Sequence, residues 1–211
     1  MSSSSRYMLL FLMLVACQSQ AQTMGSFTDS RDGQVYATVA YEFKLDDKTK
    51  STMVWMAENL NYKMEDSYCY DDYDSNCGIM GRLYSWPIAM KACPQGWHLP
   101  TDEEWYKLTD LYGGIEKSGT HIKSTSELWQ REGQGTNKSV FNAMPYGYGV
   151  KREGGIDYTS FERNAIFWSS SEKDEAYAWD WNLVTGWEKV SHSDGHKETI
   201  LNSVRCVQDG K

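Results

Sequence analysis

The chain has 211 residues, of which 40% are hydrophobic and 14% are aromatic, and its formal net charge is −8. This length suits one domain, or one domain with a short leader. Because nucleic-acid binding depends on clustered Lys and Arg, the acidic composition argues against a nucleic-acid partner.

The first residues predict an export signal. Arg6 precedes an apolar run that ends at Ala16, and this run is too short for the roughly 20 residues of a membrane-spanning helix. Leu14-Val15-Ala16-Cys17 resembles a bacterial lipobox, so residues 1–17 are predicted to be a lipoprotein signal peptide with Cys17 as the lipidated N-terminus. Cleavage after Ser19-Gln20-Ala21, which would give a secreted protein, is the alternative.

The predicted location is the bacterial cell envelope. Gln18 after the lipidated Cys resembles the enterobacterial signal for sorting to the outer membrane, so we expect an outer-membrane lipoprotein. Its membrane contact is predicted to be the N-terminal lipid anchor only. Residues 18–28 are polar and predict a flexible tether, and the folded domain is predicted to span residues 29–211.

Two strands are predicted at the start of the domain. Residues 35–41 alternate in apolar character after the Asp32-Gly33 turn, which is the periodicity of a strand. Residues 51–56 predict a second strand, which follows a polar turn at 45–50.

Two helices are predicted next. The first shares one apolar face and should start near Ser85, because Pro87 is tolerated only in the first turn; the residues of its face are Leu83, Trp86, Ala89, Met90 and Cys93. The second is predicted over residues 102–112, since Thr101 and Glu104 have the spacing of a capping box and Gly113-Gly114 ends the run.

Removal of the leader leaves four cysteines, which are Cys69, Cys77, Cys93 and Cys206. An even number in an exported chain predicts two disulfides, for which three connectivities exist. A zinc site is the weaker alternative, because no C-x-x-C pair occurs and His192 and His196 do not lie near a Cys in the sequence.

The segment between Cys69 and Cys77 holds several Asp residues. Asp72-x-Asp74-x-Asn76 suggests a calcium loop, but Cys77 stands where such a loop needs Gly and Leu83 where it needs Glu. A solvated hairpin with Asx turns is therefore the favoured interpretation of residues 71–76, and calcium binding is the alternative.

Residues 113–163 are rich in Gly, Ser, Thr and Lys and carry only short apolar islands. Such a stretch predicts a long irregular loop on the surface. Closing antiparallel strands are predicted at 165–170, 176–183, 187–191 and 203–207.

Four separated motifs carry a resemblance to a known family. They are Trp55-Met56-Ala57-Glu58-Asn59-Leu60-Asn61-Tyr62, Gly96-Trp97-His98-Leu99-Pro100-Thr101 with Glu104-Trp105, Phe167-Trp168-Ser169-Ser170-Ser171-Glu172, and Ser203-Val204-Arg205-Cys206-Val207. A further match is Phe141-Asn142-Ala143-Met144-Pro145-Tyr146-Gly147-Tyr148. From about Asp29 to Asp209 the chain resembles the Fibrobacter succinogenes major paralogous domain.

The resemblance implies an α+β, C-type-lectin-like fold that is shared with formylglycine-generating enzymes. This fold has two helices, short antiparallel sheets and a long irregular loop region, where ligands are usually met. Members of the family commonly keep the loop bounded by Cys69 and Cys77, and lectin-like domains keep a long-range bridge where Cys93 and Cys206 stand. These two disulfide pairs are therefore predicted.

Catalysis is not predicted. Formylglycine-generating enzymes use two cysteines a few residues apart, and no Cys lies between Cys93 and Cys206. Glu103 and Glu104 are explained by the start of the second helix. No cofactor and no metal ligand is predicted, because the calcium triplets of lectins are missing: Trp181-Asn182-Leu183 matches only two letters of Trp-Asn-Asp.

The ligand-binding candidates lie in or beside the long loop. Tyr146 and Tyr148 alternate with glycines, so their rings are predicted to share one side of an extended segment, and Trp187 follows a turn. Trp181 and Asn182 are further candidates, although the strand pattern also predicts a core position for Trp181.

The predicted function is that of a non-catalytic cell-surface lipoprotein with a ligand-recognition domain for adhesion or carbohydrate binding. Its partner would be a glycan or a surface protein. A structural envelope protein without a small ligand is the alternative, and an enzyme related to the formylglycine-generating group is the third hypothesis.

Overall fold

The computed structural model describes residues 22–44 and 49–210. Within these residues the chain forms an α+β structure with four α-helices and two sheets, of five and eight strands. No helix in this part of the chain is long and apolar enough to cross a membrane. The predicted signal peptide, the lipidation site Cys17, residues 18–21 of the tether and the turn at 45–48 lie outside the described residues.

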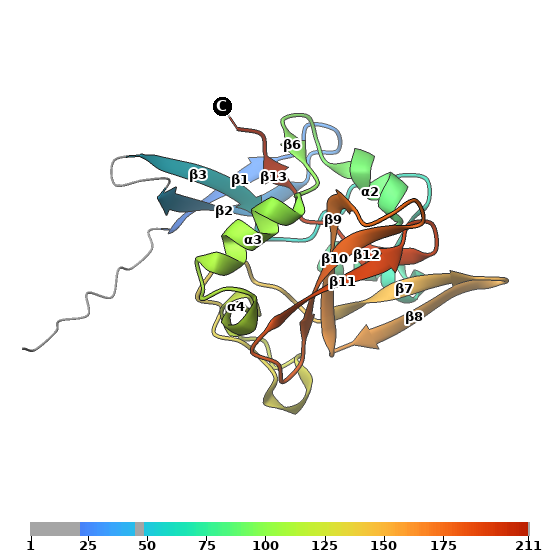
Figure 1. Cartoon of the computed structure of the whole chain (residues 1–211). Coiled ribbons are helices and arrows are strands. Elements are labelled where there is room, and N and C mark those ends of the chain that lie inside the picture. Colours follow the sequence, from blue (N-terminus) through green and yellow to red (C-terminus); the bar gives the residue numbers. More distant parts are fainter. Residues whose placement is uncertain (1–21, 45–48, 211) are drawn as a thin grey trace, which may run out of the picture.

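The first sheet has the strand order β1-β2-β3-β13-β6 (Figure 1). Its strands are β1 (Gln22–Thr28), β2 (Val35–Lys44), β3 (Lys50–Met56), β13 (Val207–Gln208) and β6 (Trp97–His98). The strands predicted at 35–41 and 51–56 are confirmed. Val39 and Tyr41 are buried in one hydrophobic cluster and Tyr36 in another, as the alternation requires.

The prediction of a flexible tether up to residue 28 is wrong for residues 22–28, which form β1 and pair with β2. The Gln22 side-chain amide donates to the Tyr112 hydroxyl and to the Lys138 carbonyl, which fixes the start of the strand. Most side chains of β1 are exposed. Backbone pairing at a sheet edge, together with the packing of Phe27 against the Trp97 ring, therefore holds this segment, and its sequence shows no apolar alternation.

The second sheet has the order β11-β10-β9-β7-β12-β5-β4, and β8 pairs with β7. Its strands are β4 (Ser67–Tyr68), β5 (Leu83–Tyr84), β7 (Tyr146–Arg152), β8 (Gly155–Phe161), β9 (Asn164–Glu172), β10 (Tyr177–Val184), β11 (Val190–His196) and β12 (Ile200–Ser203). The predicted closing strands at 165–170 and 176–183 correspond to β9 and β10. The strand predicted at 187–191 overlaps β11 only at 190–191, and the strand predicted at 203–207 overlaps only the last residue of β12 and the first residue of β13.

The helices are α1 (Asp74–Met80), α2 (Trp86–Ala92), α3 (Asp102–Asp110) and α4 (Ile115–Ile122). The two predicted helices are α2, with Pro87 in its first turn, and α3. The capping box of α3 is present: the Glu104 N–H donates to the Thr101 hydroxyl, and the Thr101 N–H donates to the Glu104 carboxylate over 2.8 Å.

Two predictions of irregular structure are wrong. Residues 74–80 form α1 rather than a hairpin, and residues 113–163 contain α4 and the β7–β8 hairpin rather than one long loop. Gly119 in α4 explains part of the difference, because a Cβ there would lie 2.7 Å from the Glu188 carbonyl oxygen. The close approach of this helix to the chain before β11 is a tertiary contact that a local sequence pattern does not show.

The core centres on Trp105 of α3, which lies between the two sheets (Figure 1). Its ring is 4.8 Å from the Trp55 ring of β3 and stacks on the Trp181 ring of β10 at 5.6 Å between centroids. Burial of such large rings on both sides of α3 joins the sheets into one structure.

Both predicted disulfides are confirmed, Cys69 with Cys77 and Cys93 with Cys206. The second joins the end of α2 to the residue before β13, and its two cysteines are separated by 113 positions.

Candidate functional site

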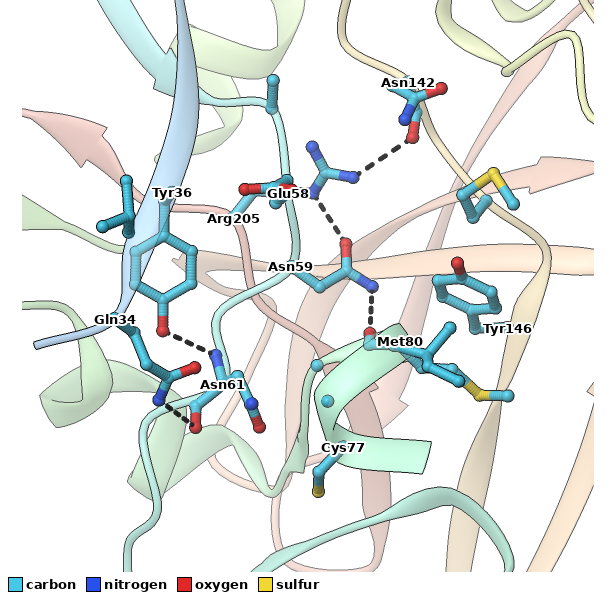
Figure 2. Close-up of a pocket in the computed structure, with 16 residues that line it drawn as sticks. Gln34, Tyr36, Glu58, Asn59, Asn61, Cys77, Met80, Asn142, Tyr146 and Arg205 are labelled. Atoms are coloured by element: carbon cyan, nitrogen blue, oxygen red, sulfur yellow. Dashed lines mark hydrogen bonds between the residues drawn. The ribbon is translucent and has the colours of Figure 1, made fainter. Parts of the chain in front are cut away.

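A polar cavity of about 210 Å³ lies where chain segments enter and leave the two sheets (Figure 2). Its lining comes from residues within 34–36 at the start of β2, 57–61 after β3, 77–81 in and after α1, and 142–146 at the start of β7, together with Arg205. We call it the Asn59–Arg205 cavity. Three of the segments are motifs that carried the family resemblance, so residues distant in the sequence meet at one place.

Arg205 forms the floor of this cavity and is only 2% exposed. Its Nε donates to Asn59 Oδ1 over 2.7 Å, and Nη1 donates to the carbonyls of Phe141 (2.8 Å) and Met56 (3.2 Å). Nη2 donates to the Asn142 carbonyl over 3.3 Å (Figure 2). Arg205 therefore ties the end of β3 to the chain that leads into β7.

The charge of Arg205 has no direct counter-ion among the described residues, because every hydrogen-bond partner given above is an uncharged oxygen. Burial lowers the pKa of Arg205 to about 9, and Tyr41 and Glu58 oppose this shift only through longer-range attraction. At neutral pH the guanidinium remains charged. A buried cation of this kind favours ligand groups that offer oxygen acceptors.

Asn59 connects the floor to α1. Its Nδ2 donates to the Met80 carbonyl over 2.9 Å and to the Ser203 hydroxyl over 3.2 Å. Gly81 permits this approach, because it has a φ of +76° and a Cβ there would lie 2.6 Å from the Asn59 Cβ. The motif after β3 and the end of α1 are thus held together at backbone contact distance.

The cavity lining combines a polar atom that has no hydrogen-bond partner with exposed apolar side chains. Asn61 Oδ1 is buried without a hydrogen-bond partner among the described atoms, and the half-buried Tyr146 lines the opposite side of the cavity (Figure 2). Val35 and Ile79 in the lining are 62% and 70% exposed. This combination is typical of a binding site rather than of a fully packed core: one cavity is lined by an acceptor oxygen, a guanidinium and exposed apolar side chains.

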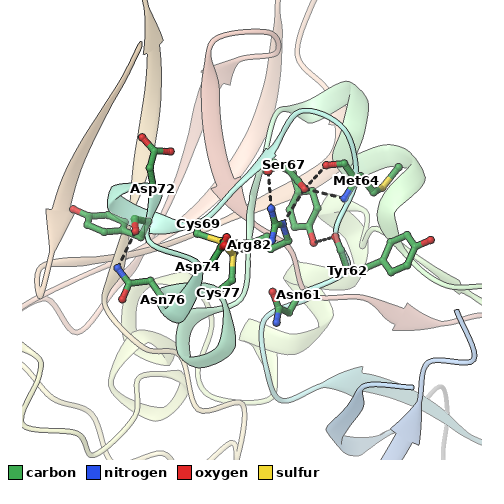
Figure 3. The surroundings of a disulfide bond; sticks show 12 residues. Asn61, Tyr62, Met64, Ser67, Cys69, Asp72, Asp74, Asn76, Cys77 and Arg82 are labelled. Atoms are coloured by element: carbon green, nitrogen blue, oxygen red, sulfur yellow. Dashed lines mark hydrogen bonds between the residues drawn. A yellow bond between two sulfur atoms is a disulfide. The ribbon is translucent and has the colours of Figure 1, made fainter. Parts of the chain in front are cut away.

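The Cys69–Cys77 disulfide fixes one wall, because Cys77 lies in α1 and lines the cavity (Figure 3). Arg82 lies beside the disulfide, with Nη1 3.1 Å from the Cys77 sulfur. The guanidinium also donates to the hydroxyl and the carbonyl of Ser67, both over 2.9 Å. The wall is therefore supported by a covalent link and by a buried cation.

The Asp-rich segment next to this disulfide uses its polar groups internally. The Asp72 carboxylate accepts a hydrogen bond from the Tyr158 hydroxyl over 2.6 Å. The Asn76 amide donates to the Tyr70 carbonyl over 2.8 Å. These bonds join the segment to the β7–β8 hairpin and to its own backbone.

The sequence-predicted binding residues do not gather in one site. Tyr146 lines the Asn59–Arg205 cavity, whereas Tyr148 and Asn182 line a second cavity of about 190 Å³. Trp187 is 45% exposed, with the Lys189 ammonium 4.9 Å from its ring centroid. The prediction that the Tyr146 and Tyr148 rings share one side of an extended segment agrees with the positions of both residues in β7. The two rings nevertheless line different cavities.

Trp181 requires a correction. It is fully buried, its ring stacks on Trp105, and its Nε1 donates to Asp102 Oδ1 over 3.0 Å. The ring has no face open to a ligand. Trp181 belongs to the core, which was the other interpretation of its strand pattern.

His98 is explained by local ion pairs. Its Nε2 lies 2.9 Å from a Glu104 carboxylate oxygen and its Nδ1 lies 2.7 Å from Asp209 Oδ1. The hydrogen bond to Glu104, reinforced by Asp209, raises the pKa of His98 to about 9 despite partial burial. A charged imidazole between two carboxylates joins the start of α3 to the C-terminal segment. Within the described part of the chain, no group of three or more His, Cys, Asp and Glu side chains is arranged to hold a metal ion.

Sequence reasoning missed Asn59 and Arg205 as cavity residues. For Arg205 a signal was present, because it is a charged residue among apolar neighbours: it follows Val204 and precedes Cys206 and Val207. A cation inside a predicted buried strand needs partners, and the search for those partners leads to this cavity.

These features define a disulfide-stabilised α+β domain with a polar cavity at the junction of its two sheets. The chain belongs to the family described as the Fibrobacter succinogenes major domain, whose model matches residues 50–208. No curated protein and no solved structure matches the chain.

Proposed function

We propose that the chain is a non-catalytic, lipid-anchored protein of the bacterial cell surface whose domain recognises a glycan through the Asn59–Arg205 cavity. The observation that carries the proposal is that one open cavity is lined both by the buried Arg205, which has no direct carboxylate partner among the described residues, and by the unpartnered Asn61 Oδ1. Sugar hydroxyls donate and accept hydrogen bonds, so they can serve both groups. The half-buried Tyr146 ring and the exposed Val35 and Ile79 side chains supply apolar contacts for a sugar face.

We further propose that the fold is of the C-type-lectin-like type. The long-range disulfide between the end of α2 and the residue before β13 supports this assignment, as does the α+β arrangement of two sheets around α3. The non-catalytic part of the proposal is supported by the pairing of Cys93 with Cys206 and of Cys69 with Cys77, which leaves these sulfurs bonded to one another rather than reactive.

The glycan proposal is tested by pull-down of the purified protein with a panel of polysaccharides, with and without EDTA. Tyr146→Ala is the variant and Tyr106→Ala is the matched control, because Tyr106 is an exposed ring on α3 that does not line the cavity. We expect wild type and Tyr106→Ala to bind the same polysaccharide and Tyr146→Ala to bind it more weakly by about 1–2 kcal/mol. Absence of binding to every polysaccharide, or equal binding by all three proteins, would contradict the proposal.

The anchor is tested separately. Cys17→Ser should move the protein from the membrane fraction to a soluble or differently processed form, because the thiol that receives the lipid is lost. A wild-type mature protein that carries no lipid and starts at Gln22 would show cleavage for secretion instead.

A structural envelope protein is the second candidate function. It is favoured by the bonds of Arg205 and Asn59, which tie several chain segments together and would be needed for stability even without a ligand. A folded, surface-exposed protein that binds no polysaccharide in the pull-down would support this candidate.

A further inference from the structure

A second cavity, of about 190 Å³, lies on the eight-stranded sheet and presents oxygen atoms from several strands. Asp180 of β10, Ser193 and Asp194 of β11, and Asn202 of β12 line it. Tyr148 of β7 also contributes to the lining. No Lys, Arg or His side chain is part of this lining, so its polar groups are carboxylates, side-chain amides and hydroxyls without a positive charge.

Asp180 is a buried carboxylate without a cationic partner in the cavity. It is 6% exposed, and its carboxylate accepts a hydrogen bond from the Ser193 hydroxyl over 2.5 Å and a long one from Asn202 Nδ2 over 3.4 Å. Burial raises the pKa of Asp180 to about 6. A carboxylate held between neutral donors gains from a cation that can enter the cavity.

Asn202 provides the independent observation. Its side chain is completely buried, and its Oδ1 has no hydrogen-bond partner among the described atoms. Buried amide oxygens are normally satisfied by a donor or by an ion. An orphaned oxygen next to a buried carboxylate, with an open cavity beside both, points to a missing positive charge.

We propose that this cavity binds a calcium ion through the Asp180 carboxylate, Asn202 Oδ1 and the Ser193 hydroxyl. Ca²⁺ accepts six to eight oxygen ligands, charged and neutral, in flexible geometry, and water fills the positions that the protein leaves open. The Asp194 carboxylate is not part of this ligand set, because Asp194 lies opposite Trp179 on the other face of the strand pair and is paired with Lys173 over 2.6 Å. Nitrogen and sulfur ligands, which zinc prefers, are absent from the lining.

The rival place for calcium is the Asp-rich segment at 71–76. Its Asp72 and Asn76 groups already take part in the hydrogen bonds to Tyr158 and Tyr70 described above, so an ion there would have to displace internal bonds. In the Asp180 cavity, by contrast, an ion would displace fewer hydrogen bonds, because Asn202 Oδ1 has no donor and the bond from Asn202 Nδ2 to the Asp180 carboxylate is long. One experiment can therefore separate the two places by substitution.

The test measures Ca²⁺ binding to the purified full-length protein by calorimetry and by Tb³⁺ luminescence sensitised by nearby Trp rings, together with melting temperature in EDTA and in Ca²⁺. Asp180→Asn is the main variant, because it keeps the shape and removes the charge. Asn202→Asp adds a carboxylate at the orphaned oxygen. Asp74→Asn, in the Asp-rich segment, is the matched control.

We expect Ca²⁺ to raise the melting temperature of wild type and of Asp74→Asn equally. Asp180→Asn should melt no lower than wild type in EDTA, because a buried charge is removed, but should lose the Ca²⁺-induced rise and bind Ca²⁺ about tenfold or more weakly. Asn202→Asp should bind Ca²⁺ more tightly. The proposal is overturned if wild type does not bind Ca²⁺, if Asp180→Asn binds as tightly as wild type, or if Asp74→Asn abolishes binding.

Discussion

Trp181 and Trp187 show how far the environment of a ring decides its role. Trp181 is fully buried against Trp105, whereas Trp187 is 45% exposed after the β10 strand. We expect Trp181→Ala to lower the free energy of unfolding by about 3–5 kcal/mol through cavity formation. Trp187→Ala should cost less than about 1 kcal/mol, since the ring is largely exposed and its contact with the Lys189 ammonium is of the weak, solvent-exposed kind. Urea denaturation of both variants checks this, and similar losses would show that Trp187 also belongs to the core.

His98 predicts a pH dependence of stability. The pKa of His98 is raised from 6.5 to about 9 in the folded state by its hydrogen bonds to Glu104 and Asp209. A raised pKa means that the stabilisation is complete below the unfolded-state pKa and is lost as the pH rises through the folded-state pKa. The melting temperature of wild type should therefore fall between about pH 6.5 and pH 9, and this fall should be smaller in His98→Gln.

His121→Gln is the control for this pH series, because burial and Lys138 lower the pKa of His121 instead of raising it. Its loss should leave the decline above pH 6.5 unchanged. If His98→Gln and wild type showed the same decline, the ion pairs of His98 would contribute nothing to folding.

At the scale of elements, the sequence predicted the helices and strands that have a recognisable local sequence pattern. The strands β2 and β3 alternate in apolar character, α2 has Pro87 in its first turn, and α3 has a capping box; each was found in its predicted place. The elements that were missed depend on contacts distant in the sequence. β1 depends on pairing with β2, and α4 depends on the close approach at Gly119.

The chain that follows α4 is another part of the structure that depends on contacts distant in the sequence and was therefore not predicted. The Lys123 ammonium, which is buried, donates to the carbonyls of Gly133 and Trp187 over 2.9 Å each, and to that of Val184 over 3.3 Å. Burial lowers the pKa of Lys123 to about 8. A cation bound by backbone carbonyls orders this polar segment, but the composition of the segment suggested only an irregular surface loop.

The cap of α3 gives a prediction for one element. Thr101→Ala removes the hydroxyl that accepts from the Glu104 N–H, and we expect a loss of about 1 kcal/mol of unfolding free energy. Glu103→Gln is the comparison, since it removes only an exposed pair with Lys107 and should cost less than about 0.5 kcal/mol. Chemical denaturation measures the loss of unfolding free energy in each of the two variants. Equal effects would mean that the helix start is held by packing of Trp105 rather than by its cap.

At the scale of the whole molecule, the candidate site was only partly predictable. Tyr146 was found because an aromatic residue among glycines stands out in the sequence, and it does line the Asn59–Arg205 cavity. The buried Arg205 was seen only as part of a motif, because its role depends on carbonyls of Met56 and Phe141 that no local pattern brings together. A cavity formed by several chain crossings becomes visible only when the strands are assembled.

The two disulfides should act on different properties of the molecule. Cys93 and Cys206 are separated by 113 positions and Cys69 and Cys77 by 8, so chain-entropy estimates give upper figures of about 5 and about 2.5 kcal/mol for the two closures. We expect replacement of Cys93 and Cys206 by Ala to lower the melting temperature more than replacement of Cys69 and Cys77. Thermal unfolding of the two double variants measures this difference.

For local opening of α1, we expect the Cys69–Cys77 disulfide to matter more than the Cys93–Cys206 disulfide. The Cys69–Cys77 bond holds α1, whose residues 77–80 form a wall of the Asn59–Arg205 cavity, whereas the Cys93–Cys206 bond does not touch this helix. Amide hydrogen exchange of residues 74–80 should therefore rise in the variant without Cys69 and Cys77, because local opening of α1 no longer has to break or stretch a covalent link. In the other variant, exchange in α1 should change only as far as global stability falls. If α1 exchanged equally fast in both variants, its wall of the cavity would be held by Asn59 and Arg82 alone.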